Sequence, residues 1–253
     1  MRFIRLLTTG VAALALSAAA HAAPEKTPAG IDPQTIVEKA DEVRFPDHGF
    51  EVEVDIDSKL AGGNSEARKY KVLSKGNENT VVMVVEPASE RGQIMLMKGR
   101  DLWIFLPNVS QPVRLGLAQR LTGQVANGDL ARANFAGDYK PKLLRTEEVD
   151  GQPCYVLELT AADRGVTYGK VMYWVRKSNF WPHKAEFYSL SGRLLKTAHY
   201  REYQQMAGRV RPTELLMEDA LRKGEQSTMA YRNMKPRELP DKIFTKDYLK
   251  RLE

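Results

Sequence analysis

Three short segments between Val81 and Leu106 are apolar at consecutive positions, and they constrain the fold more than any other feature of this chain. They read Val81–Val85, Ile94–Met97 and Leu102–Leu106. An antiparallel strand with one face in water alternates apolar and polar residues, so strands of this kind must be covered on both faces. Because the chain has many hairpin signals and few helical ones, we expect one face to line a chamber for an apolar ligand.

The first 22 residues have the pattern of a secretory signal peptide. Arg2 and Arg5 precede the apolar segment Leu6–Ala20, and Ala20-His21-Ala22 offers small residues for cleavage after Ala22. An uncleaved membrane anchor is the alternative, but the apolar segment is shorter than the ~20 residues of a spanning helix. We therefore predict a protein exported to the periplasm, with a signal peptide over residues 1–22 and a single domain over residues 23–253.

The remaining pattern predicts an antiparallel meander with helices at its start, middle and end. Asp32-Pro33 is typical of an N-cap followed by the first helical residue, and this helix should end before Pro46. From Phe50 onward apolar and acidic residues alternate, as in a strand with one wet face. Closely spaced hairpin signals then predict about ten or eleven antiparallel strands. A terminal helix is expected over 241–252.

The segment Asn108–Lys142 interrupts this pattern and is predicted to be a lid or binding loop. It is irregular, with short helix-like pieces at Leu115–Leu121 and Asp129–Phe135. Basic residues outnumber acidic ones in and just beyond it, which fits either a solvated loop or a rim that contacts lipid phosphates or an acidic partner. The candidate rim residues are Arg114, Arg120 and Arg132.

No grouping of titratable residues in the sequence is typical of an enzyme, a metal site or a nucleic-acid interface. His48, His183 and His199 lack metal-ligand spacing, and the single cysteine, Cys154, lies in a strand-like segment that favours burial over reactivity. The net charge of +6 is mild, and no basic segment is interleaved with aromatic residues. We predict a protein without enzymatic activity, cofactor, metal or nucleic-acid partner. A hydrolase assembled from distant residues is the alternative.

Methionine usage indicates that the apolar ligand is a lipid. Met83, Met95 and Met97 fall in the two-faced strands, which are the segments named above that are apolar on both faces, and Met172 falls in a further one, Val171–Val175. Methionine adapts to variable apolar shapes. An acyl chain in water costs ~0.8 kcal/mol per methylene, so a lipid needs a chamber to cross an aqueous compartment. The alternative is that these methionines fill an ordinary core. The candidate lipid-binding residues are Met83, Val85, Met95, Met97, Trp103, Phe105, Leu121, Phe135, Met172 and Trp174.

Several motifs resemble the outer-membrane lipoprotein-sorting (LolA-like) family, chiefly between Met97 and Leu144. The similar elements are Asp101–Pro107, Val113–Leu115, Gly123–Leu130, Gly137–Tyr139, Tyr173–Val175, Trp181-Pro182 and Ser191–Arg193. The resemblance implies a mainly β (α+β) fold, in which an unclosed antiparallel barrel of about eleven strands encloses a hydrophobic cavity under a helical lid.

The same resemblance implies a function. The protein would shield the acyl chains of a lipid or lipoprotein and carry them from an inner-membrane exporter, of the proton-driven or ABC type, towards the outer membrane. The chain is longer than the classical carrier, chiefly through Asn108–Lys142, which leaves the cargo open. The alternative is a periplasmic lipid sensor or regulatory binding protein of the same fold.

Overall fold

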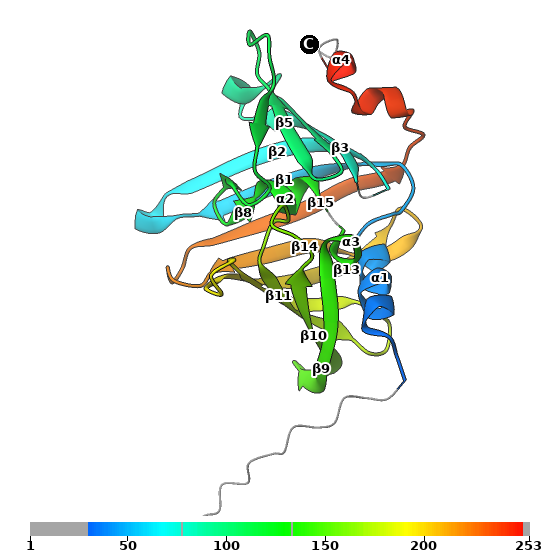
Figure 1. Cartoon of the computed structure of the whole chain (residues 1–253). Coiled ribbons are helices and arrows are strands. Elements are labelled where there is room, and N and C mark those ends of the chain that lie inside the picture. The colour runs from blue at the N-terminus through cyan, green and yellow to red at the C-terminus, as the bar shows by residue number, and fades with distance from the viewer. Residues whose placement is uncertain (1–29, 77, 133, 250–253) are drawn as a thin grey trace, which may run out of the picture.

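A large antiparallel sheet forms most of the molecule (Figure 1). The computed structural model describes residues 30–76, 78–132 and 134–249, so the predicted signal peptide lies outside the described residues. The sheet has thirteen strands in these ranges, and a second sheet has two. Two short 3₁₀ turns, η1 (Ala61–Gly63) and η2 (Ala88–Glu90), lie in the hairpins.

The thirteen strands form two meanders that meet in the middle of the sheet. The first comprises β1 (Phe50–Lys59), β2 (Ser65–Lys75), β3 (Asn79–Glu86), β4 (Ile94–Lys98), β5 (Asp101–Phe105) and β6 (Val113–Leu115). The second comprises β9 (Tyr139–Val149), β10 (Gln152–Ala161), β11 (Lys170–Arg176), β12 (Pro182–Tyr188), β13 (Leu194–Met206), β14 (Arg209–Asp219) and β15 (Gln226–Pro236). β1 pairs with β15, whereas β6 and β9 are unpaired edges, so the barrel does not close. This confirms the predicted fold class.

The crossover segment, residues 116–138, connects the two edges of the sheet. It contains β7 (Arg120–Thr122), β8 (Val125–Ala126), α2 (Asn127–Ala131) and α3 (Phe135–Asp138). The helix expected at Leu115–Leu121 was wrong, because this part of the chain is extended or turned. The second predicted piece falls across α2 and α3.

The edge strand β9 was not predicted from the sequence. It contains Pro141, and a proline has no N–H to donate to a neighbouring strand. β9 pairs only with β10, so its outer side has no partner strand and tolerates the proline. Three basic residues, Lys140, Lys142 and Arg145, also lie in β9, where charge discourages pairing between molecules.

The N-terminal helix α1 (Pro33–Arg44) forms as the sequence predicts. The Asp32 carboxylate accepts a hydrogen bond from the Gln34 amide at 3.3 Å, and the helix ends at Phe45, before Pro46. Its apolar stripe, which includes Ile36, Val37 and Ala40, is fully buried. α1 packs against α3, β9, β12 and β14, so it covers one half of the concave face (Figure 1).

The two-faced strands are covered by protein on both sides. In β4, Met95 and Met97 join the main core, whereas Ile94 and Leu96 join a second cluster on the opposite face. That second cluster is completed by the C-terminal segment, residues 239–249, which contains η3 (Asp241–Phe244) and α4 (Lys246–Leu249). Within the described residues these two short helices replace the single terminal helix that was expected. The outer face of β3–β5 therefore needs no ligand to cover it.

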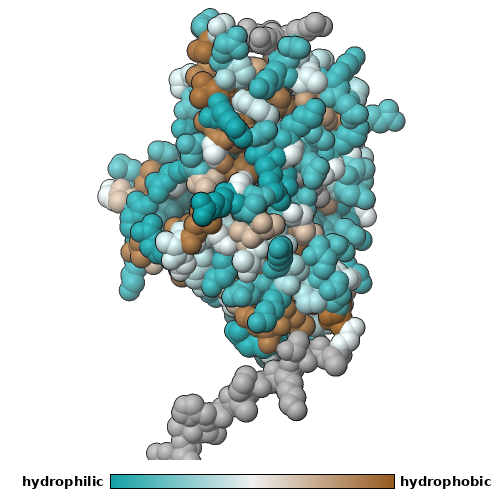
Figure 2. Space-filling model, in the orientation of Figure 1, coloured by the Kyte–Doolittle hydropathy of each residue, from teal (hydrophilic) through white to brown (hydrophobic). Residues whose placement is uncertain are grey.

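The visible face of the molecule in Figure 2 is mostly hydrophilic, with hydrophobic residues in small groups. None of the helices in the described part of the chain has the length and apolar character that a bilayer crossing requires. The large apolar surface lies inside, between the concave face of the sheet and the segments that cover it.

Candidate functional site

The concave face of the sheet is a continuous apolar surface. Inward side chains of both meanders, such as Val54, Ile56, Leu157 and Met217, form one cluster that also includes the buried stripe of α1. Alternation along each strand places them there, because every second residue points to the same face. Two segments cover this surface: α1 and the crossover segment. Together we call them the lid.

The two parts of the lid are joined by a buried carboxylate. Oδ2 of Asp41, in α1, accepts a hydrogen bond from the Ala136 amide of α3 at 2.8 Å, and Oδ1 pairs with Arg44 Nη1 at 2.9 Å. Arg44 in turn lies over the Phe135 ring, 4.1 Å from its centroid. Burial raises the pKa of Asp41 to about 6, although the Arg44 guanidinium opposes this shift. On the surface side, Gln34 Nε2 donates to the Ala136 carbonyl at 3.1 Å.

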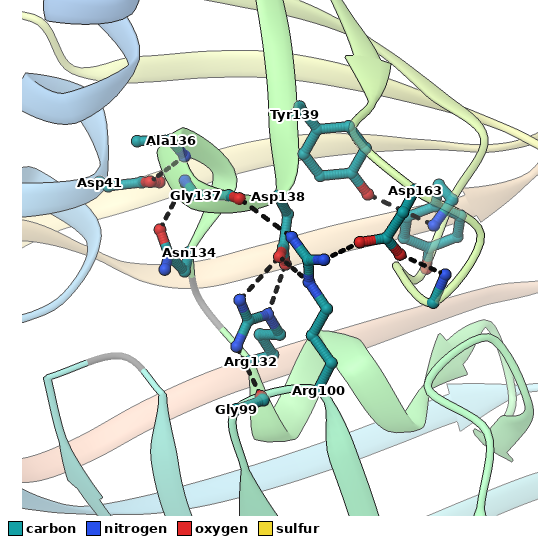
Figure 3. A network of polar contacts seen from close by, with 12 residues as sticks. Asp41, Gly99, Arg100, Arg132, Asn134, Ala136, Gly137, Asp138, Tyr139 and Asp163 are labelled. Atoms are coloured by element: carbon teal, nitrogen blue, oxygen red, sulfur yellow. Dashed lines mark hydrogen bonds and ion pairs between the residues drawn. The ribbon is translucent and has the colours of Figure 1, made fainter.

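A second polar contact fixes the end of the crossover segment (Figure 3). Arg132 binds Asp138 through two hydrogen bonds, Nε to Oδ2 at 2.5 Å and Nη2 to Oδ1 at 2.7 Å. Its Nη1 donates to the Gly99 carbonyl in the β4–β5 turn at 2.7 Å. Arg100 reaches Asp138 from the same turn and also pairs with Asp163, in the β10–β11 loop. These contacts connect the crossover segment to both meanders.

A buried lysine forms the third contact between lid and barrel. Nζ of Lys196, on the inward face of β13, lies 2.5 Å from Asp129 Oδ2 in α2 and donates to the Gln124 carbonyl at 2.7 Å. Desolvation lowers the pKa of Lys196, while Asp129 opposes the shift. The Tyr168 hydroxyl donates to the same carboxylate at 2.8 Å. An ion pair with both members this deeply buried adds little net stability, but it fixes how α2 sits on the barrel.

Two glycines let the crossover segment lie directly on the barrel. Gly123 has φ +48°, and a Cβ there would lie 2.2 Å from Ser58 Oγ and 2.3 Å from Ser227 Oγ. The next amide, of Gln124, donates to Ser227 Oγ at 2.8 Å. At Gly128 in α2, a Cβ would lie 2.0 Å from Thr167 Oγ1. The lid is thus seated by close backbone contact as well as by charge.

The space left under the lid is small. A cavity of about 20 Å³ lies beside Arg44, Asp129, Arg132 and Phe135, and it has room for roughly one water molecule. Sites for small organic ligands are typically ~300–1,000 Å³. Around this cavity the lid therefore fills the predicted hollow, and a ligand could reach this part of the concave face only if the lid moved.

Solved structures with the same fold identify the family. A LolA superfamily protein from Nitrosomonas europaea is 61% identical over 87% of this chain and 100% of its own, with a TM-score of 0.83. This chain belongs to the LolA superfamily. Two further structures show the same fold at lower identity. A DUF1329 family protein from Desulfovibrio piger is 24% identical over 87% of this chain and 100% of its own, with a TM-score of 0.75. A domain described as an outer membrane lipoprotein-sorting protein domain from Vibrio parahaemolyticus is 22% identical over 86% of this chain and 98% of its own, with a TM-score of 0.74.

A family model described only as uncharacterized protein-like matches residues 76–251. No match is found among the curated proteins. The LolA-superfamily membership that the sequence motifs predicted is thus confirmed by the solved relative.

The LolA-superfamily fold distributes nine of the ten candidate lipid-binding residues over three clusters and leaves Val85 outside them. Met95 and Met97 are buried in the main core cluster, to which the lid itself contributes Phe135 and, at the edge, Leu121. Met83, Trp103 and Phe105 lie on the opposite face, against the C-terminal segment, where the Lys246 ammonium is 4.0 Å from the Trp103 centroid. Met172 and Trp174 form a separate outer cluster with Cys154, and Val85 is exposed. The ten residues therefore do not line one chamber, and their contact with lipid stays a prediction.

The three candidate rim arginines differ in their exposure to solvent. Arg120 is exposed, and Arg114 is exposed and pairs with Asp101. Arg132 is not at a rim: its side chain is only 4% exposed and is held by Asp138, which corrects the prediction for this residue. Burying a guanidinium is costly unless its donors are hydrogen-bonded, and the donors of Arg132 are bonded to groups that hold the lid.

Sequence reasoning missed the charged residues that hold the lid. Asp41 and Arg44 lie on the same helical stripe as Val37 and Ala40, at spacings of three and four residues. Lys196 alternates with Ala198 and Tyr200 on the inward face of β13. In both cases the signal was a charged residue at a position that the period assigns to the core. Among the described residues, no three His, Cys, Asp or Glu side chains are grouped so as to hold a metal ion.

Proposed function

We propose that this protein is a periplasmic carrier that binds the acyl chains of a lipid or lipoprotein on its concave face. It receives them from an inner-membrane exporter and delivers them towards the outer membrane. The observation that carries the proposal is the lid: an apolar concave face is covered by two segments that are held by buried charges and hydrogen bonds. The description of the Vibrio relative as a lipoprotein-sorting domain agrees with it.

The composition of the lid supports a cover that opens. Apolar packing would stabilise a permanent core more than buried charges do, because the attraction between buried charges hardly offsets the free-energy cost of removing them from water. Here three buried ion pairs lie where the lid meets the barrel or where the parts of the lid meet. They are Asp41–Arg44, Asp129–Lys196 and Arg132–Asp138. The Lys196–Asp129 pair joins the crossover segment to the barrel and is broken when the lid lifts, whereas Asp41–Arg44 and Arg132–Asp138 each stay within one part of the lid.

The apolar surface that the lid covers has the chemistry of an acyl-chain site. Met95, Met97 and Met217 lie in it beside aliphatic residues, and methionine side chains adapt to ligands of different shape. Each methylene moved from water to this surface contributes ~0.8 kcal/mol, so a sixteen-carbon chain supplies on the order of 12 kcal/mol towards displacing the lid.

The direct test is lipid analysis of the mature protein. Protein expressed with its signal peptide and purified from the periplasm without detergent should carry a phospholipid or another acylated molecule, visible by native mass spectrometry. Protein that stays free of lipid, even after incubation with membrane extract, would overturn the proposal. Recovery of a transmembrane regulator instead of an exporter by cross-linking in cells would favour the sensor alternative.

A covalent bridge between the two parts of the lid tests whether they must separate to open the concave face. We would place cysteines at Gln34 and Ala136, whose side chain and carbonyl are hydrogen-bonded, in a Cys154→Ala background, and bridge them with a cleavable bis-maleimide. The bridged protein should fail to take up a fluorescent fatty acid, and cleavage of the bridge should restore uptake.

The matched control joins two other segments. Lys75 Nζ and Asp241 Oδ1 are 2.7 Å apart and link β2 to the C-terminal segment on the outer face. The same bridge between cysteines at these positions should leave uptake unchanged. Equal uptake by both bridged proteins would show that the lid does not control access to the lipid.

A further inference from the structure

One end of the sheet carries two exposed leucines on neighbouring hairpin turns. Leu190, in the β12–β13 turn, is 70% exposed, and Leu221, in the β14–β15 turn, is 69% exposed. No other large hydrophobic residue in the described ranges exceeds 48%. Both turns lie at the left-hand end of the strands in Figure 1, opposite α1, and the Ala220 amide donates to the Leu195 carbonyl at 3.1 Å, which joins them.

Several basic side chains lie between these two turns. An open hollow of about 210 Å³ lies between the two turns and the β7–β8 hairpin, and its lining includes Arg120, Arg193, Arg222 and Lys196. Arg222 pairs with Asp219 and Glu225, and Lys196 pairs with Asp129. Lys223 follows Leu221 and Arg222 in the same turn. Within the described residues, no carboxylate lies within ion-pair distance of Arg120, Arg193 or Lys223. These three cations are therefore free to bind an external anion.

We propose that this end of the barrel, with Leu190, Leu221, Arg120, Arg193 and Lys223, docks onto the surface of an anionic lipid bilayer. The leucines enter the boundary between headgroups and acyl chains, as apolar residues beside cations do in interfacial segments. The arginines and the lysine contact lipid phosphates, and their long stems allow them to reach the headgroups while the leucines are inserted.

A bilayer fits this surface better than a protein partner does. The leucines stand at the tips of two turns and are separated by charged residues, so they form no continuous apolar patch for a folded interface. Unpaired cations beside the tips complement the negative potential of an anionic leaflet, which attracts each basic residue near the surface. The proposal goes beyond carriage, because the two leucine turns lie outside the concave face and docking needs no cargo.

The test is sedimentation of the full mature protein with vesicles of phosphatidylglycerol and phosphatidylethanolamine, and with vesicles of phosphatidylcholine alone. The wild-type protein should bind the anionic vesicles and lose binding at 0.5 M salt, because surface charges are then screened. The pair Leu190→Ser and Leu221→Ser should lower the partition coefficient on the order of tenfold. The pair Arg120→Gln and Arg193→Gln should lower it roughly twenty-fold.

Matched variants at other exposed positions control for folding and net charge. Val109→Ser removes a 48% exposed apolar residue next to the opposite edge of the sheet, and Arg201→Gln with Lys242→Gln removes two exposed charges. Both should bind vesicles as the wild type does. Inorganic phosphate at 10 mM should not release the protein from vesicles, since docking also depends on the leucines.

Three outcomes would overturn the proposal. The first is equal binding to anionic and neutral vesicles. The second is a decrease of less than twofold in the partition coefficient of either double variant, the leucine pair or the arginine pair. The third is binding of phosphate without binding of vesicles. The result is independent of the carrier proposal. Protein with the bridge between positions 34 and 136 should still sediment with vesicles, whereas its uptake of fatty acid should be lost.

Discussion

The amide of Ala136 in α3 donates a hydrogen bond to the Asp41 carboxylate in α1, across 2.8 Å and 95 residues of sequence. This bond joins the two parts of the lid, which lie far apart in the sequence. Asp41 also pairs with Arg44, so one buried carboxylate connects the backbone of α3 to a guanidinium that lies on the Phe135 ring.

Protonation of Asp41 should stabilise the closed protein. Its pKa is raised to about 6 in the folded state against 3.8 normally, so the folded state binds the proton more tightly than the unfolded state does. This contribution to the free energy of unfolding therefore grows as the pH falls through 6 and is complete below 3.8. Between pH 7 and pH 5 the wild type should gain about 1 kcal/mol more than Asp41→Asn.

Urea unfolding of both proteins at the two pH values measures this difference. Glu42→Gln, which changes an exposed carboxylate of the same helix, is the control and should follow the wild type. Parallel stability curves for the wild type and Asp41→Asn would show that Asp41 does not titrate in this range.

Removing one partner of the buried Arg132–Asp138 pair should be costly. Arg132→Met leaves the Asp138 carboxylate with less compensation, and breaking a buried pair in this way costs about 3 kcal/mol or more. Arg100→Met, which removes a partner that is 35% exposed, should cost about 1 kcal/mol or less. The measurement is the midpoint of urea unfolding, and equal costs for the two variants would contradict the assigned roles.

Gly128→Ala should weaken the seating of the crossover segment. An alanine usually stabilises a helix relative to glycine by ~1 kcal/mol, but here its Cβ would overlap Thr167 Oγ1 at 2.0 Å and Cγ2 at 2.8 Å. Both γ atoms are too close, so rotation of the threonine does not relieve the contact. We expect faster cleavage of the crossover segment by protease and a loss of about 1–3 kcal/mol in unfolding free energy.

Gly116→Ala tests the same substitution without the overlap. Its Cβ would meet Gln119 at 3.5 Å, an ordinary contact, so the protease pattern should match that of the wild type. A stabilised Gly128→Ala protein would mean that α2 shifts without penalty.

Phe244→Ala should destabilise the protein although Phe244 lies far from the lid. Its side chain is 2% exposed and packs with the outer residues of β3–β5, so the cavity it leaves should cost about 3–5 kcal/mol. Leu190→Ala, at a residue that is 70% exposed, should change the unfolding free energy by about 0.5 kcal/mol or less. A small effect at Phe244 in thermal or urea unfolding would show that the C-terminal segment is dispensable.

The local patterns of the chain predicted its elements better than their partners. Asp32-Pro33 correctly marks the start of α1, and the alternation from Phe50 correctly marks β1. The two-faced strands were also real, but the sequence pattern does not say whether a ligand or another segment covers the outer face. Here Leu239, Ile243, Phe244 and Leu249 cover it, more than 130 residues away along the chain.

The division of the candidate lipid-binding residues follows from strand register. Lys98 pairs with Asp101 across the two-residue turn Gly99-Arg100, so Met97 lies opposite Leu102 and Leu96 lies opposite Trp103. Directly opposed residues share a face. The turn signal alone therefore places Trp103 on the face opposite Met97, and a register argument could have separated these two residues from the sequence. Which of the faces is concave depends on the whole sheet.

The seam between β1 and β15 has a consequence for the export that the proposed periplasmic function requires. It pairs Glu51 with Lys235, so the first strand of the sheet is joined to the last. A chain that threads through a translocation channel from its amino end brings out all seven strands of the second meander before this seam can form. Until residue 236 has emerged, β1 exposes a free edge. The order of the strands therefore makes the sheet complete late, and the free edge must meanwhile be kept from pairing with other chains.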